Sequence, residues 1–149
     1  MILSNTELFQ RYPAIEAIDA YLAQQLCESL GSDNEVLQHI LIALSESLRN
    51  GHSCLPLAPD AGVALVRCWS TEQQQGYVFP GSAHLLQVLS AFAIGPHDGA
   101  PIVLQASKLY LRRYWHYEQQ VAQELLQRMQ PQVLSAQQTQ VAEQLLTQL

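Results

Sequence analysis

Apolar residues recur every three or four positions through the first third of the chain, which is the pattern of amphipathic helices. The segment Ser4–Glu7 has the form of a capping box and predicts a short helix that Pro13 interrupts. Two longer periodic runs follow. Their apolar positions are Ile15, Ile18, Leu22, Leu26 and Leu30 in the first, and Val36, Leu37, Ile40, Leu41, Leu44 and Leu48 in the second.

Capping residues mark the boundaries of these two runs. Gly31 is suited to end the first helix, because glycine readily adopts the left-handed conformation of a C-cap. Ser32–Glu35 has the form of a second capping box, and Asn50-Gly51 is expected to end the second helix. Since so few residues separate the two helices, we expect them to pack antiparallel as a hairpin.

The middle of the chain is less regular. Residues 51–62 (GHSCLPLAPDAG) contain prolines and glycines without a helical period, so they predict an extended connector. Residues 62–69 (GVALVRCW) fit either a short buried strand or a helical turn, and residues 71–81 (TEQQQGYVFPG) have the composition of a loop. Ser82 is expected to cap a helix that carries Leu85, Leu86, Val88, Leu89 and Phe92, and residues 95–101 (GPHDGAP) are expected to form a loop.

The hydrophobic period then changes to two. Ile102–Gln105 and Lys108–Arg112 are rich in β-forming residues and flank Ala106-Ser107, so they predict an antiparallel β-hairpin at about residues 102–112. Because the pair lacks the Asn-Gly or Gly-Gly of tight turns, we expect its loop to be longer than two residues.

From Tyr114 the helical period returns. One apolar stripe consists of Tyr114, Tyr117, Val121 and Leu125, and a second lies beside it with Trp115, Ala122, Leu126 and Met129. Pro131 is expected to end this helix, and Ser135 is expected to cap a last helix that runs through Val141, Leu145 and Leu149.

These elements predict an α+β fold that is mainly α. It has an N-terminal helical hairpin, further helices and a small antiparallel β-hairpin that leads into a helix. We expect one domain over residues 1–130, with residues 131–149 as a linker and a helix leading out of it. The chain ends without a C-cap or a tail, so we expect it to be a fragment of a larger protein.

Composition narrows the possible functions. Apolar residues make up 48% of the chain and charged residues 13%, which excludes a disordered chain. Glutamine replaces charge on many expected outer faces, which fits either a surface that a partner covers or an ordinary soluble protein. With neither a long apolar run nor a signal sequence, we expect a cytoplasmic protein without a membrane span.

The sequence offers little for catalysis or metal binding. It has no GxxxxGK[ST] and no GxGxxG, so we expect no nucleotide cofactor. Cys27, Cys54 and Cys68 lack CxxC spacing and are interpreted as buried free thiols. His52 beside Ser53 or Cys54 is a conceivable nucleophilic pair, but we favour a connector whose Cys54, Leu55 and Leu57 enter the core while His52 faces outward. No other histidine shares ligand spacing with His52, so we expect no metal.

One stretch, residues 108–123 (KLYLRRYWHYEQQVAQ), combines basic and aromatic residues in a chain of net charge −6. Three interpretations are open. Leu109, Leu111, Trp115 and Tyr117 can belong to the core, with the arginines solvated. The stretch can instead anchor a protein partner, since tyrosine, tryptophan and arginine are enriched at interfaces. It can also bind single-stranded DNA by stacking, with Lys108, Arg112 and Arg113 as the basic patch.

Two blocks of the sequence resemble a known family. GHSCLPL, residues 51–57, is similar to the GH-V/S-C-L-x-L element near the start of the alpha subunit (RecD) of exodeoxyribonuclease V. PIVLQASKLYLRRYWHYEQQVAQ, residues 101–123, resembles the family's P-L-V-L-x-x-x-R-L-Y-L-x-R-Y-W-x-x-E-x-x-L-A block. The resemblance covers roughly residues 15–149. Lys108 stands where the family usually has arginine, and Gln105-Ala106-Ser107 replaces a turn that is commonly glycine-rich.

The resemblance implies a role. Family members are 5′ to 3′ superfamily 1 helicases that act with RecB and RecC in the ATP-dependent RecBCD helicase–nuclease of double-strand break repair and recombination. Their motor motifs lie beyond the N-terminal domain, which is non-catalytic and docks onto RecC. The implied expectation is a docking domain without a cofactor of its own, in a subunit that uses ATP and Mg²⁺ and reaches DNA through the full complex. Residues 131–149 would then lead toward the motor domain.

Within this expectation, the candidate partner interface consists of Tyr110, Arg112, Arg113 and Trp115. The alternative is a small DNA-binding accessory module that uses the patch from Lys108 to Arg113.

Overall fold

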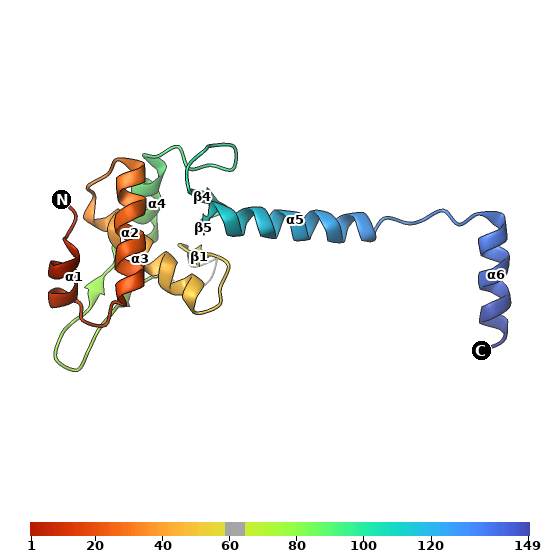
Figure 1. The fold of residues 1–149 in the computed structure, drawn as a ribbon, viewed down its shortest axis with the longest axis horizontal. Helices are drawn as coiled ribbons and strands as arrows, with labels where there is room; N and C mark the ends of the chain where they lie inside the picture. Colours follow the sequence, from red (N-terminus) through yellow and green to blue (C-terminus); the bar gives the residue numbers. More distant parts are fainter. Residues whose placement is uncertain (59–64) are drawn as a thin grey trace. The chain divides into compact units, whose positions relative to one another are not determined.

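The computed structural model describes residues 1–58 and 65–149. It divides into two compact units, Met1–Glu118 and Gln119–Leu149, which are described separately. Helices dominate, and two small antiparallel sheets accompany them, so the predicted mainly α, α+β fold is confirmed (Figure 1). The predicted boundary after residue 130, between the domain and the linker with its helix, stays a prediction.

The first unit begins with three helices, α1 (Asn5–Arg11), α2 (Ala17–Leu30) and α3 (Glu35–Arg49). Ser4 caps α1 in the predicted capping box with Glu7. Gly31 ends α2 in the left-handed conformation with φ 63°, as predicted. α2 and α3 pack against each other as the expected helical hairpin (Figure 1).

The cap of α3 differs from the prediction. Asn34, and not Ser32, is its N-cap, and the Asn34 side chain accepts a hydrogen bond from the backbone N–H of Leu37 at 3.1 Å. Because the helix begins at Glu35, Ser32 lies too far upstream to reach its free N–H groups. The Ser32 hydroxyl accepts the backbone N–H of Asn34 instead, at 3.2 Å.

The buried face of α2 also differs from the predicted stripe. Ile18 is 63% exposed, whereas Ala20, Ala23, Leu26 and Cys27 are buried. Leu26 is buried as predicted, but Ala20 and Ala23 take the place expected for Ile18, since small side chains let the backbones of two packed helices approach closely.

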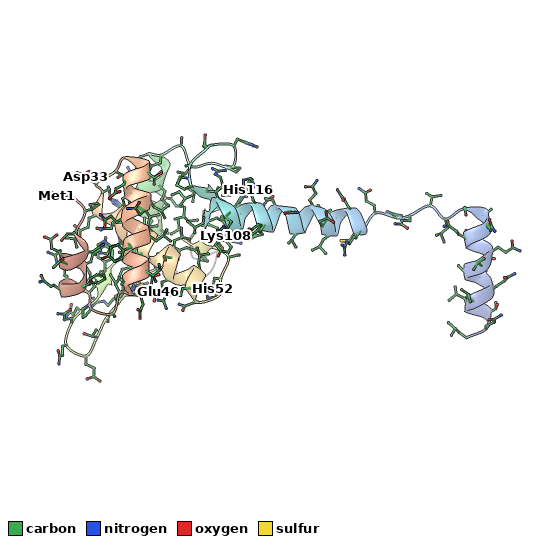
Figure 2. The ribbon with its side chains drawn as sticks, in the orientation of Figure 1. Met1, Asp33, Glu46, His52, Lys108 and His116 are labelled. Atoms are coloured by element: carbon green, nitrogen blue, oxygen red, sulfur yellow. The ribbon has the colours of Figure 1, made fainter. Side chains whose placement is uncertain are left out.

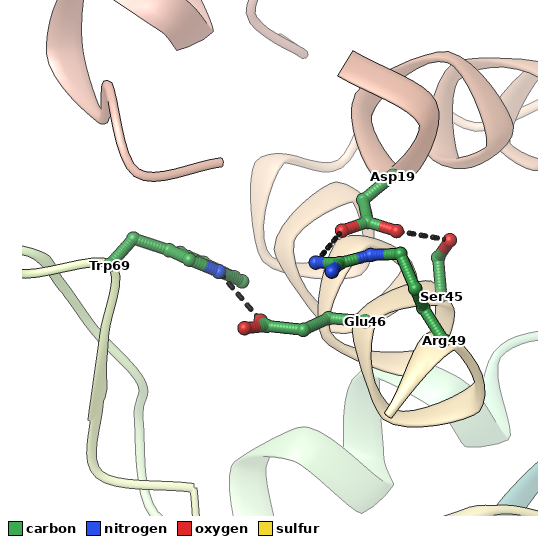
Figure 3. Close-up of polar contacts among 5 residues, drawn as sticks. All are labelled: Asp19, Ser45, Glu46, Arg49 and Trp69. Atoms are coloured by element: carbon green, nitrogen blue, oxygen red, sulfur yellow. Dashed lines mark hydrogen bonds and ion pairs between the residues drawn. The ribbon is translucent and has the colours of Figure 1, made fainter. Parts of the chain in front are cut away.

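A buried carboxylate links α2 to α3 in the same contact. The Ser45 hydroxyl donates to Asp19 Oδ1 at 2.6 Å, and Arg49 Nη2 donates to Asp19 Oδ2 at 3.0 Å (Figure 3). Asp19 is only 2% exposed, and a buried charge is tolerated when it is paired and hydrogen-bonded in this way. Glu46 follows Ser45 on α3, and its Oε2 accepts a hydrogen bond from Trp69 Nε1 at 2.8 Å.

The core of the first unit gathers around α3. Leu37, Ile40, Leu41, Ile42 and Leu44 are all fully buried. α4 (Ser82–Ser90) packs on α3 with Leu85 and Leu89 buried, so the predicted fourth helix is confirmed. Its predicted cap is wrong, because the N-cap is Gly81 and no side chain bonds to the helix start.

The predicted β-hairpin is present. β4 (Ile102–Gln105) pairs antiparallel with β5 (Lys108–Leu111), and β1 (Leu55–Pro56) adds to β5 to give the order β1-β5-β4. The sequence predicted only an extended connector at β1. Leu109 lies opposite both Leu104 and Leu55 and is fully buried.

The turn of this hairpin is shorter than expected. Only Ala106 and Ser107 connect the strands, with φ values of 49° and 57°. Two successive left-handed residues match the twist of a two-residue hairpin, although neither is glycine or asparagine. The Ser107 carbonyl also accepts the backbone N–H of Leu57 at 2.9 Å, which holds the turn against the segment after β1.

A second small sheet was not predicted. β2 (Arg67–Cys68) pairs antiparallel with β3 (Tyr77–Val78), so the assignment of residues 71–81 to loop alone is wrong. Within residues 62–69, the described part contains a strand that is exposed or half-buried rather than buried, and residues 62–64 lie outside the described residues.

Helix α5 (Arg112–Arg128) follows β5 directly, and α6 (Ala136–Thr147) comes after it. α5 begins two residues before the predicted Tyr114 and ends shortly before Pro131. Ser135 caps α6 in a capping box with Gln138, which confirms that N-cap. Neither helix contains a buried residue.

Candidate interaction surface

Tyr110 is an interior residue that joins three segments of the first unit. Its side chain is 5% exposed, and burial raises its pKa to about 12. The hydroxyl donates to Glu118 Oε1 at 3.4 Å, and the Ser53 hydroxyl donates to Glu118 Oε2 at 3.1 Å. Glu118 therefore ties the second turn of α5 to β5 and to the segment before β1.

Arg112 binds the loop between α4 and β4. Its Nη1 and Nη2 donate to the carbonyls of Pro96 and Gly95, each at 3.1 Å, and its Nε donates to the carbonyl of Ala100. Its backbone N–H donates to the Pro101 carbonyl at 2.8 Å. The half-buried guanidinium thus bonds to the carbonyls of Pro96 and Ala100 and shares the Gly95 carbonyl with the Asp98 backbone N–H.

Trp115 and Arg113 differ in their surroundings. The Trp115 ring is half-buried, and its Nε1 donates to the Gln105 side chain at 2.8 Å, which ties α5 to β4. Arg113 is exposed, and within the described chain its guanidinium has no hydrogen-bond or ion-pair partner. Of the four predicted interface residues, Arg113 is thus the one whose functional group is free for another molecule.

The basic patch considered for DNA binding is divided by these contacts. Lys108 lies on β5, half-buried and opposite Gln105 and Pro56, while Arg112 is committed to the loop carbonyls. Figure 2 shows Lys108 on the sheet and His116 on the adjoining helix. Lys108 is only partly accessible and Arg113 is exposed, and the two come from different elements.

Helix α5 presents apolar side chains to solvent. Tyr114 and Tyr117 are 37% and 57% exposed, and their rings meet edge to face with centroids 6.3 Å apart. Val121 and Leu125 continue the same stripe and are 59% and 56% exposed. The sequence predicted this stripe, but periodicity says only that a face is apolar and not what covers it.

The second apolar stripe of α5 is also exposed to solvent after Trp115. Leu126 and Met129 are 66% and 77% exposed. Most surface residues of a folded protein are polar, so contiguous exposed apolar residues of this size on a helix indicate an interaction site.

The segment with His52 and Cys54 lies at the edge of an open cavity. Ser47, His52, Ser53, Cys54 and Leu55 border an open cavity of about 350 Å³ beside β1. The Ser53 hydroxyl is directed to Glu118 and not to the His52 ring. Among the described residues, no three His, Cys, Asp or Glu side chains are grouped closely enough to hold a metal ion.

The cysteines are free, as predicted, but only Cys27 is buried, while Cys54 and Cys68 are half-buried. Burial raises the pKa of Cys27 to about 11 and also raises that of Cys68. Both thiols therefore stay protonated at neutral pH, which makes them poor nucleophiles. No described helix has the length and apolar character that crossing a bilayer requires.

Comparison with known proteins gives one family. No curated protein matches the chain. Residues 13–110 match the family described as RecBCD enzyme subunit RecD, N-terminal domain. The match covers α2 through β5 and ends at Tyr110, just before the exposed helix α5. The chain therefore belongs to the family of N-terminal domains of the RecD subunit of the RecBCD enzyme, as its two sequence blocks indicated.

Proposed function

We propose that this chain is a non-catalytic docking domain that attaches a RecD-like helicase subunit to a RecC-like subunit. The assembly would be an ATP-dependent exodeoxyribonuclease V that acts in double-strand break repair and recombination. ATP and Mg²⁺ would bind to the motor domain of the full subunit, and DNA would be reached through the complex. The site of action would be the cytoplasm.

The observation that carries the proposal is the exposed face of α5. Tyr114, Tyr117, Val121 and Leu125 lie on one helix face that no described residue buries. Protein interfaces bury such faces. When an amphipathic helix binds in a groove, apolar residues three or four positions apart, like these, are the ones that contact the partner. The four side chains of this stripe carry no charge, which favours an apolar partner surface over phosphates.

The proposal is tested by binding of the chain to the purified RecC-like subunit from the same organism, measured by isothermal titration calorimetry. Leu125→Glu places a charge on the stripe, and we expect it to weaken binding by about tenfold or more. Gln127→Glu adds the same charge to the same helix off the stripe and should bind like the unchanged chain. Both positions are exposed, so both variants should melt normally.

Absence of binding by the unchanged chain would contradict the docking function. Salt-dependent binding of single-stranded DNA that Lys108→Gln weakens would favour the accessory DNA-binding module instead. Fluorescence anisotropy with a labelled oligonucleotide at low ionic strength measures that alternative directly.

A further inference from the structure

We propose that Arg113, Tyr114 and Tyr117 form the anchor of the docking surface. The protein surface that they meet would combine an apolar pocket for the tyrosine rings with a carboxylate beside it for Arg113. The inference rests on the proposed docking function and adds which residues carry it and which partner chemistry they fit. These three residues are called the anchor below.

The anchor lies on a part of α5 that is fixed at both ends. At its start, the Arg112 backbone N–H and guanidinium bond to the carbonyls of the loop at residues 95–101. In the middle, Trp115 Nε1 bonds to Gln105, and at the end Glu118 accepts the hydroxyls of Tyr110 and Ser53. These contacts use one side of the helix and leave the anchor on another.

Fixing these turns lowers the cost of binding. Ordering a flexible segment or side chain at an interface costs free energy that a pre-organised site avoids. The anchor's backbone is already held by the contacts of Arg112, Trp115 and Glu118. The two tyrosine rings also restrict each other through their edge-to-face contact at 6.3 Å. Tyrosines in this state are typical of residues whose truncation costs most at interfaces.

The charge around the anchor indicates the chemistry of the partner. Residues 108–118 contain three basic residues and one acidic residue, within a chain of net charge −6. The acidic residue, Glu118, is occupied by two hydroxyls, and Arg112 is occupied by carbonyls. Arg113 is thus the exposed charge next to the rings, and its complement is a carboxylate.

A protein carboxylate fits better than nucleic acid. Tight phosphate binding needs several cations that act together, because each neutralised phosphate adds a separate contribution from counterion release. Here Arg112 is committed internally and Lys108 lies half-buried on the sheet. One exposed arginine beside two tyrosines matches a single ion pair next to an apolar pocket.

The experiment uses the full chain and the RecC-like subunit, with affinities from calorimetry at two salt concentrations. We expect Tyr117→Ala and Tyr114→Ala each to weaken binding by about 10- to 30-fold. Arg113→Gln should weaken binding and reduce its salt dependence, and Arg113→Lys should restore part of both. The matched controls are Tyr21→Ala, an exposed tyrosine on α2, and Arg11→Gln, an exposed arginine on α1; both should bind normally.

The outcomes separate the inference from the proposed function. If the unchanged chain and Leu125→Glu behave as the docking function requires but the three anchor variants bind normally, the anchor is wrong and the docking function stands. If the unchanged chain does not bind, both are wrong. Loss of oligonucleotide binding in Arg113→Gln, with unchanged protein binding, would overturn the anchor in favour of nucleic acid. A circular dichroism melt of every variant ensures that the losses are not unfolding.

Discussion

The buried side chain of His39 is expected to link folding of the first unit to pH. Its side chain is fully buried on α3, where Nδ1 lies 2.7 Å from the Glu35 carbonyl and Nε2 has no partner among the described residues. The ring stacks on Tyr77 with centroids 3.7 Å apart and meets the edge of Tyr12. Burial lowers the pKa of His39, so the neutral ring is the native form, with Nδ1–H donating to the carbonyl.

This environment predicts acid sensitivity of the first unit. Because the folded-state pKa lies below the unfolded value of about 6.5, the unfolded chain binds more protons as pH falls below that value. The contribution of His39 to the free energy of unfolding should therefore be fully present above about pH 6.5 and should decline below it. His39→Phe keeps a ring against Tyr77 and removes the titrating group, so its urea-unfolding free energy should depend less on pH between about 6.5 and 4.5.

The matched control for this experiment is His84→Phe, because His84 is exposed in the first turn of α4. Its variant should keep the pH dependence of the unchanged chain. Equal slopes for the His39 variant and the unchanged chain would show that His39 does not link folding to pH.

At the scale of elements, the β2–β3 pair depends on one glycine. A Cβ at Gly76 would lie 1.8 Å from the Cys68 carbonyl oxygen and 2.5 Å from the Ser70 backbone nitrogen. These are backbone atoms that cannot rotate away, so only glycine fits between the two strands. Trp69, which follows β2, adopts φ 60° and places its ring on Tyr77 and Phe79.

We therefore expect Gly76→Ala to destabilise the first unit by about 2–4 kcal/mol. The added Cβ would push the two strands apart, and the aromatic contacts of Trp69 with Tyr77 and Phe79 would be lost. Gly99→Ala is the control, because its Cβ would meet nothing within 4 Å. Thermal unfolding followed by tryptophan fluorescence compares the two. Equal melting temperatures would mean that the loop between β2 and β3 relaxes without cost.

The elements that the sequence predicted correctly are those with strong local signals. Capping at Ser4, Gly31 and Ser135 and the alternation in Ile102–Leu111 depend on neighbouring residues, and all of them appear. The sheet of β2 and β3 depends instead on pairing across a polar glutamine-rich loop. Such two-residue strands carry too little periodicity to be seen in the sequence.

The candidate site was predictable as a location but not in its details. The basic and aromatic composition of residues 108–123 selected α5, yet the role of each residue depends on contacts with distant segments. Arg112 meets carbonyls of residues 95–101, and Tyr110 meets Glu118, so both stabilise the fold. No local pattern separates such an arginine from its exposed neighbour Arg113. Likewise, helical spacing placed Ile18 in the core, whereas alanines occupy the contact with α3.

At the scale of the whole molecule, the core lies within the first unit. Every residue of the buried apolar cluster precedes residue 110, and α5 and α6 contribute no buried side chain. The first unit should therefore fold without the exposed apolar residues that follow Glu118. Within the first unit, the contacts of Trp115 and Glu118 hold the start of α5 to the sheet and to the segment before β1.

Two shortened chains test this separation. A chain ending at Glu118 keeps the core and the contacts of Trp115 and Glu118, so its unfolding free energy should match that of the full chain within about 1 kcal/mol. A chain ending at Arg113 leaves Tyr110, Ser53 and Gln105 without those partners and should lose about 1–3 kcal/mol. Urea unfolding followed by circular dichroism measures both. The chain ending at Glu118 should also bind the RecC-like subunit more weakly than the full chain, because it keeps Tyr114 and Tyr117 but lacks Val121 and Leu125. Equal destabilisation of the two shortened chains would show instead that residues after Glu118 support the fold.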